Sequence, residues 1–223
     1  MDSPAAAAPA KPHGHSIGFN LAVIALSVAV GALGVAYLID GAERLARKPR
    51  VSDDAVVTRT LGSTTLTIPA SWLPDGVATT GDFAKQIDLA LSLPLGPDGA
   101  LRPIDVTLTQ RSRVRPSAAL LDGVYLHQFG DKQVSGPVGL VGKPMTAGDG
   151  YDGETVWYDP LTPNPFVAKC EAPVAATTTG KCLRTVYLGS GIAAVYSFDT
   201  DVLESWRRFD AELHPLLDRI GAL

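Results

Sequence analysis

Two stretches, QIDLALSL (residues 86–93) and PIDVTLTQ (residues 103–110), decide the fold class of this chain. Large apolar side chains alternate in both of them with polar or small ones. The alternating apolar residues are Ile87, Leu89, Leu91 and Leu93 in the first stretch and Ile104, Val106 and Leu108 in the second. A period of two turns one face of a strand towards the core and the other towards water. The pattern therefore predicts antiparallel strands with a single buried face.

Further segments with the composition of strands extend this sheet along the chain. They are residues 64–69 (TTLTIP), 154–159 (ETVWYD), 165–171 (PFVAKCE), 181–188 (KCLRTVYL) and 192–198 (IAAVYSF). The Gly-Ser-Gly sequence at 189–191 is typical of a hairpin turn between the last two. We therefore expect most of the chain after residue 55 to form one mostly antiparallel sheet.

Two segments have their apolar residues at helical spacing instead. They are residues 115–131 (RPSAALLDGVYLHQFGD) and residues 201–223 (DVLESWRRFDAELHPLLDRIGAL). The spacing predicts a mid-chain helix and a long C-terminal helix. Together with the strands, these helices make the expected fold class α+β.

The C-terminal helix carries the more specific predictions. Asp201 and Glu204 have the spacing of a capping box at its start. Trp206 and Phe209 lie on its apolar stripe, and we expect both to be deeply buried against the sheet. Pro215 is expected to kink or split the helix, because proline lacks the backbone N–H that the helix needs.

The N-terminal part of the chain differs from the rest in hydropathy. Residues 17–39 (IGFNLAVIALSVAVGALGVAYLI) contain no charged side chain and are long enough, as a helix, to cross a bilayer. A cleavable signal peptide is the alternative, because Gly34 and Ala36 form a small-residue cleavage pattern. The expected organisation is 1–16 disordered Ala/Pro tail, 17–39 transmembrane helix, 40–55 juxtamembrane linker and 56–223 α+β extracytoplasmic domain.

Charge is distributed unevenly along the chain. Residues 1–50 carry five Lys and Arg against three Asp and Glu, whereas residues 51–223 carry fourteen against twenty. A body with a net charge of −6 is a poor ligand for a phosphate backbone. The composition therefore argues against nucleic acid as a partner.

The order of elements resembles that of PsbP-like domains. The resemblance is carried by LTIPASW (residues 66–72), the mid-chain helix, the run of antiparallel strands and YSFDTDVLESW (residues 196–206), and it covers about residues 56–221. It implies an α/β/α sandwich that serves as an assembly or binding module. The resemblance brings no catalytic residues with it.

Motifs of catalysis, cofactor binding and metal binding do not occur in this sequence. It has no phosphate-binding loop, no nucleophile elbow, no HExxH and no CxxC, and we predict no catalytic residues, no cofactor and no metal. An enzyme with a carboxylate site is the alternative. Its candidate acids are Asp149, Asp152, Glu154 and Asp159, which are clustered in one loop region.

Arg111, Arg113 and Arg115 are candidates for a surface contact. If the preceding strand continued, their spacing would place three guanidinium groups on one strand face, where they would grip an acidic partner or an anionic headgroup. The alternative is that they extend a solvated face and protect the strand end. The sequence favours this second interpretation.

The only two cysteines, Cys170 and Cys182, lie on either side of a loop with strand-like flanks. Folding that loop back as a hairpin places the two cysteines opposite each other, and this predicts a disulfide. Free buried thiols are the alternative. A disulfide implies an oxidising compartment.

The orientation of the membrane span is where two signals conflict. Arg44, Arg47, Lys48 and Arg50 follow the span, and the positive-inside rule would keep the following domain in the cytoplasm. The cysteines favour the periplasm, and we follow them because large domains are translocated despite such a bias. We therefore predict a single-pass protein of the cytoplasmic (inner) membrane, anchored in the bilayer through residues 17–39. Its periplasmic domain is expected to serve as a non-catalytic accessory, assembly or binding module for a membrane-protein partner, with a cytoplasm-facing domain as the alternative.

Overall fold

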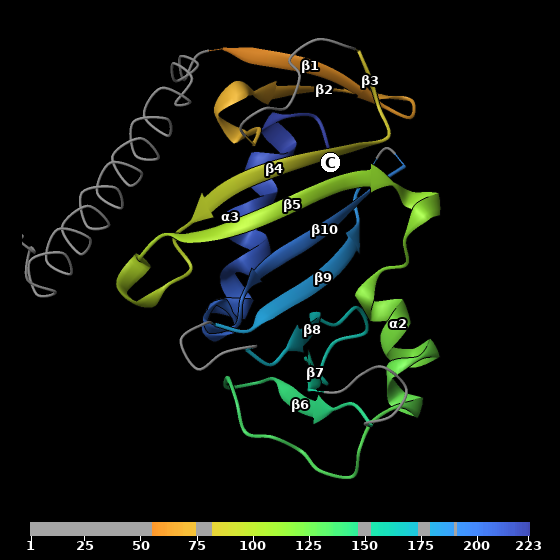
Figure 1. The fold of residues 1–223 in the computed structure, drawn as a ribbon, viewed down its shortest axis with the longest axis vertical. Coiled ribbons are helices and arrows are strands. Elements are labelled where there is room, and N and C mark those ends of the chain that lie inside the picture. Colours follow the sequence, from red (N-terminus) through yellow and green to blue (C-terminus); the bar gives the residue numbers. More distant parts are fainter. Residues whose placement is uncertain (1–54, 75–81, 147–152, 174–178, 190) are drawn as a thin grey trace, which may run out of the picture. The chain divides into compact units, whose positions relative to one another are not determined.

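A seven-stranded antiparallel sheet forms the centre of the described part of the protein (Figure 1). The computed structural model describes residues 55–74, 82–146, 153–173, 179–189 and 191–223. The predicted tail (1–16) and span (17–39) lie outside these residues, as does the predicted linker (40–55) except for its last residue. Within the described residues, no helix is long and apolar enough to cross a membrane.

Each strand of the large sheet pairs antiparallel with its neighbours. In spatial order the strands are β4 (Gln86–Leu93), β5 (Arg102–Gln110), β10 (Ile192–Asp199), β9 (Lys181–Tyr187), β8 (Val167–Glu171), β7 (Glu154–Tyr158) and β6 (Val141–Pro144). The alternation in the sequence appears directly in the burial of β4. Its apolar residues are buried and its polar or small residues are exposed along the whole strand.

A second, three-stranded sheet precedes the large one in the chain. Its strands, in spatial order, are β2 (Thr64–Pro69), β1 (Val56–Leu61) and β3 (Phe83–Ala84). The sequence did not predict β1, because Arg59 occupies a buried position between Val57 and Leu61 and interrupts the apolar pattern. Thr67 N donates to Ile220 O at 3.1 Å, so β2 is joined to the end of the C-terminal helix.

Helices occur mid-chain and at the C-terminus, as the sequence predicted, although the mid-chain one is much shorter. The mid-chain helix is α2 (Ser117–Gly123), followed by the single turn η4 (Tyr125–His127). The backbone of Val124 leaves the helical region between them, and this ends the predicted helix early. The C-terminal helix begins as the 3₁₀ segment η5 (Thr200–Ser205) and continues as α3 (Trp206–Arg219). Short 3₁₀ turns also occur at η1 (Ala70–Trp72), η2 (Pro97–Gly99) and η3 (Arg111–Arg113).

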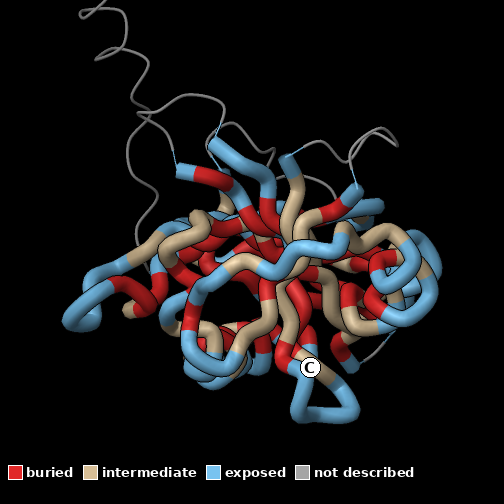
Figure 2. The backbone as a smooth tube through the Cα atoms, turned by 90° about the horizontal axis from the view of Figure 1, so that it is seen from below, coloured by how far each residue is buried: buried red, intermediate tan, exposed pale blue. Residues whose placement is uncertain are grey.

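The main core lies between α3, the small sheet and one face of the large sheet. Phe209 of α3 is fully buried, and its ring lies 4.9 Å from that of Phe198 and 5.5 Å from that of Tyr196. Leu61 and Leu66 of the small sheet belong to the same cluster. Figure 2 shows the buried residues gathered inside the domain and the exposed ones on its loops.

A second cluster covers the opposite face of the sheet at its β6–β8 end. It consists of Leu121, Tyr125, Met145, Val156 and Val167. Four of these residues come from α2, η4, β7 and β8, and Met145 directly follows β6. The short helix α2 therefore covers a face that the main core does not reach.

Three details of the C-terminal helix differ from the sequence-based predictions. The prediction of a capping box is wrong. Asp201 lies inside η5, and its Oδ2 lies 2.6 Å from Arg102 Nε instead of capping the helix. Trp206 is only half-buried, and its indole Nε1 donates to Val138 O at 3.2 Å. Pro215 does not split α3, which continues to Arg219, and the proline itself is exposed.

Candidate functional site

The best candidate for a binding surface is the end of β5, where the chain leaves the sheet. Gln110, the last residue of β5, pairs with Ile192, the first residue of β10, so no neighbouring strand continues beyond it. The chain therefore turns into η3, and Arg111 N donates to Gly191 O of the β9–β10 hairpin at 2.9 Å. The expectation of three arginines along one strand face is thus wrong, because these residues are not in a strand.

Tyr187, the last residue of β9, supports the arginine turn. The guanidinium carbon of Arg111 lies 4.0 Å from the centre of the Tyr187 ring, a cation–π distance. The Tyr187 hydroxyl donates to Val114 O at 3.0 Å, on the far side of the turn. We call Arg111, Arg113, Arg115 and Tyr187 the arginine edge.

In the part of the chain that the structure describes, the three arginines of the arginine edge have no acidic partners, unlike four other basic residues of the domain. Arg111, Arg113 and Arg115 are exposed, and none has a carboxylate within ion-pair distance among the described residues. The ion pairs elsewhere are Arg102–Asp201, Lys169–Glu154, Lys181–Asp199 and Arg184–Asp210. Three adjacent positive charges are therefore available to a ligand.

A shallow groove of about 580 Å³ runs beside Arg111. Its walls are Leu61, Gly62, Ser63, Gln110, Arg111, Ser112, Tyr187 and Gly191. The groove thus joins the β1–β2 turn, the end of β5 and the β9–β10 hairpin, which meet at the right-hand end of the sheet in Figure 1. Gly62 has φ +65°, a left-handed conformation that favours glycine in this turn.

A second cavity, of about 360 Å³, adjoins the other side of Tyr187. It is lined by Pro116, Ser117, Ala118, Ala119, Asn164, Pro165, Val167, Arg184, Thr185, Val186 and Tyr187. In the described part of the chain β8 pairs with β9 only at Leu183 and Cys182, so the following residues of β9 face this cavity. Ser117 Oγ accepts a hydrogen bond from Thr185 N at 2.9 Å and satisfies part of that open strand edge.

Arg184 lines the second cavity but is not available to an anion. Its side chain is 8% exposed, and its two terminal nitrogens donate to the two carboxylate oxygens of Asp210 at 2.5 and 2.8 Å. The guanidinium also lies 4.6 Å from the ring centre of Phe166. Burial raises the pKa of the neighbouring Tyr196, so this phenol stays protonated. The sequence pattern gave no indication of this buried pair.

The acids of the alternative carboxylate site have structural partners where the structure describes them. Glu154 pairs with Lys169 at 2.5 Å, and Asp159 accepts hydrogen bonds from Leu161 N and Thr162 Oγ1 in its own turn. Asp149 and Asp152 lie outside the described residues. Among the residues that the structure covers, no group of three His, Cys, Asp or Glu side chains is placed to hold a metal ion.

Cys170 and Cys182 form a disulfide, the pairing that the hairpin spacing predicts. The two residues stand opposite each other in the β8–β9 register, and both are buried. The bond therefore closes the loop between the two strands. A buried disulfide indicates an oxidising, extracytoplasmic compartment.

Comparisons with known proteins define the fold but not a family. Neither the known protein families nor the curated proteins gave a match to this chain. A fold of this α+β class occurs in Smlt3025, an immunity protein of the Stenotrophomonas maltophilia type IV secretion system. The two structures match with a TM-score of 0.52 and 15% sequence identity, over 75% of this chain and 93% of that chain. At this identity the match shows a shared fold alone.

This match corrects the predicted resemblance to PsbP-like domains. In the structure, residues 66–72 are the end of β2, closed by Pro69, and the turn η1. A strand that ends at a proline follows from the missing backbone N–H and occurs in many folds. The motif is therefore local geometry and does not identify that family.

Proposed function

We propose that this protein is a non-catalytic binding protein, anchored in the inner membrane, whose 56–223 domain binds a protein partner in the periplasm. The observation that supports it most is the fold shared with an immunity protein, since immunity proteins act by binding. In the same way, we propose that the partner is a toxic effector protein delivered by a bacterial secretion system. The exposed arginines beside a groove support a binding role for this domain.

A co-culture experiment tests this function on the full chain. Recipient cells with and without the gene are mixed with donor cells whose type IV secretion system delivers toxic effectors. We expect the gene to raise recipient survival, and a donor with an inactive secretion system serves as the control. The experiment is repeated for each effector that the donor encodes. If the two recipients survive equally well beside the active donor in every case, the proposal is contradicted.

The proposed location needs a test of its own. The disulfide favours the periplasm, whereas the four basic residues after the apolar segment favour the cytoplasm. A phosphatase reporter fused after Leu223 is expected to be active, because that enzyme needs disulfides to fold. Thiol labelling of the denatured, unreduced chain is expected to find no free cysteine. A silent reporter together with two free thiols would place the domain in the cytoplasm.

A further inference from the structure

We infer that the arginine edge binds an acidic segment of the protein partner, an inference that rests on the proposed binding function. Its first basis is a contrast of charge. Residues 51–223 carry twenty acidic side chains and fourteen basic ones, and three of the fourteen stand at this edge. Lys85 is exposed as well. Gln86 pairs with Thr109, and this register places Lys85 opposite Gln110, next to Arg111. The edge is thus a positive site on a negative body.

The second basis is that the edge is already ordered for binding. Long arginine side chains lose rotamer freedom when they bind, and that loss opposes binding. Stacking on the Tyr187 ring already restricts Arg111, and the hydrogen bonds to Gly191 O and Val114 O fix the backbone turn. Less freedom is therefore lost when a carboxylate arrives.

The third basis is the chemistry of the groove beside Arg111. Ser63, Gln110 and Ser112 bring side-chain hydroxyl and amide groups to its walls, and these groups donate hydrogen bonds to carboxylates and peptide carbonyls. Arginine binds carboxylates with two parallel hydrogen bonds, which adds geometric specificity. The groove therefore suits a short peptide segment with acidic side chains.

The fourth basis distinguishes a protein segment from other polyanions. A bilayer surface or a nucleic acid presents negative charge over a wide area, and much of it would face the acidic remainder of the domain. A short segment meets only the edge. Screening over about 8 Å at physiological ionic strength keeps the repulsion from more distant acids small for such a segment.

The test uses the full chain in a nonionic detergent and a fluorescein-labelled decapeptide of alternating Glu and Ser, with a Gln/Ser decapeptide as the neutral probe. Fluorescence anisotropy gives the affinity. We expect Arg111→Gln, Arg113→Gln and Arg115→Gln, combined, to weaken binding of the acidic peptide about tenfold at low salt. The wild type should also lose affinity as salt is added, and the triple variant should lose much less.

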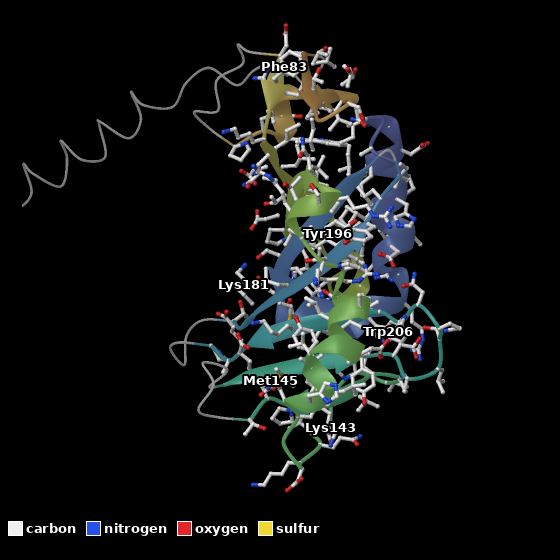
Figure 3. The ribbon with its side chains drawn as sticks, turned by 90° about the vertical axis from the view of Figure 1, so that its right-hand side faces the viewer. Phe83, Lys143, Met145, Lys181, Tyr196 and Trp206 are labelled. Atoms are coloured by element: carbon white, nitrogen blue, oxygen red, sulfur yellow. A yellow bond between two sulfur atoms is a disulfide. The ribbon has the colours of Figure 1, made fainter. Side chains whose placement is uncertain are left out.

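A second triple variant controls for net charge. Lys132→Gln, Lys143→Gln and Arg207→Gln remove the same charge away from the arginine edge. Figure 3 shows Lys143 at the opposite end of the domain from Phe83, which is two residues before Lys85 in the sequence. We expect this variant to bind the acidic peptide as the wild type does. Equal losses in both triple variants, or no preference of the wild type for the acidic peptide, would overturn the inference.

Two further measurements separate the alternatives. Adding phosphatidylglycerol to the micelles is expected to leave peptide binding by the wild type unchanged. If the lipid displaces the peptide from the wild type but not from the triple arginine variant, the inference is overturned in favour of a lipid headgroup. In the co-culture experiment, equal protection by the wild type and the arginine variant would overturn the inference and leave the proposed function intact. If neither protects, the proposed function fails, and the peptide measurement still decides whether the edge binds acidic segments.

Discussion

The β4–β5–β10 half of the large sheet and its β6–β7–β8 half differ in what covers them. The first half has strands of eight or nine residues, with the main core on one face and exposed residues such as Asp88, Ala90 and Asp105 on the other. The second has strands of four or five residues with packing on both faces. Adjacent residues of β8 show this, since Val167 belongs to the small cluster and Ala168 to the main core.

The difference shows how each half is stabilised. The long strands of the first half bury their apolar face against α3 and the small sheet, and this burial is enough to stabilise them. The short strands of the other half have fewer buried apolar side chains of their own, and they gain a disulfide and the Lys169–Glu154 ion pair. We therefore expect the first half to depend on core volume and the second on the covalent bond.

The largest expected effect is in the core of the first half. Phe209→Ala removes a fully buried ring that contacts Phe198 and Tyr196, and we expect it to lower the free energy of unfolding by about 3–5 kcal/mol. Phe83→Ala is the matched control, because Phe83 is 83% exposed and should change stability by less than about 0.5 kcal/mol. Urea unfolding of the detergent-solubilised chain, followed by tryptophan fluorescence, measures both. Similar losses in the two variants would show that α3 does not close the core.

The disulfide tests the second half. Replacing Cys170 and Cys182 together by serine should cost about 3 kcal/mol on the chain-entropy account. Hydrogen exchange should accelerate in β8, the start of β9 and β7, and much less in β4 and β5, because the bond joins β8 to β9 and β7 pairs with β8. Reduction of the wild type should give the same exchange pattern. Uniform acceleration throughout the sheet would mean that the two halves unfold as one unit.

The small cluster offers a finer comparison within the second half. Leu121→Ala removes a buried side chain of α2 and should lower the free energy of unfolding by about 2 kcal/mol. Leu126→Ala, a few residues later and 49% exposed, should have little effect. Thermal melts of both variants measure this. If the two melts coincide, α2 does not stabilise this end of the sheet.

The two halves also explain which elements the sequence could predict. β4 and β5 follow directly from their alternating residues, because one face of each strand meets water. β6 (Val141–Pro144) carries Gly142 and Lys143 within four residues, and so short a segment shows no period. β1 escaped prediction because Arg59 is buried, and such burial depends on the tertiary surroundings.

The candidate site was predictable only in its residue types. The sequence singled out Arg111, Arg113 and Arg115, but it placed them on a strand face. The contact of Arg111 with Tyr187 depends on where β5 ends against β10 and on the β9–β10 hairpin, and it joins residues more than seventy positions apart in the sequence. No local pattern contains that register. The cysteine pairing was predictable, since it needs only one hairpin.

The smallest expected effect lies where the two halves meet. Lys181 at the start of β9 stands opposite Asp199 at the end of β10, with Lys181 Nζ 2.7 Å from Asp199 Oδ1. The hydrogen bond from Lys181 lowers the pKa of Asp199 below its ordinary value. The unfolded chain therefore takes up a proton at this carboxylate at a higher pH than the folded one. The pair stabilises the fold above the unfolded pKa of about 3.9, and that contribution disappears as the pH falls through the lower folded pKa.

Asp199→Asn should accordingly reduce the free energy of unfolding at pH 7 by less than about 1 kcal/mol, because the pair is partly exposed. The difference from the wild type should shrink towards zero as the pH falls below the folded pKa. Lys181→Gln should give a similar loss at pH 7, and the double variant should lose little more than either single one. A difference that persists undiminished in acid would mean that Asp199 acts through packing and not through its charge. In that case, a fall in pH would not destabilise the contact between β9 and β10 more than it destabilises the rest of the sheet.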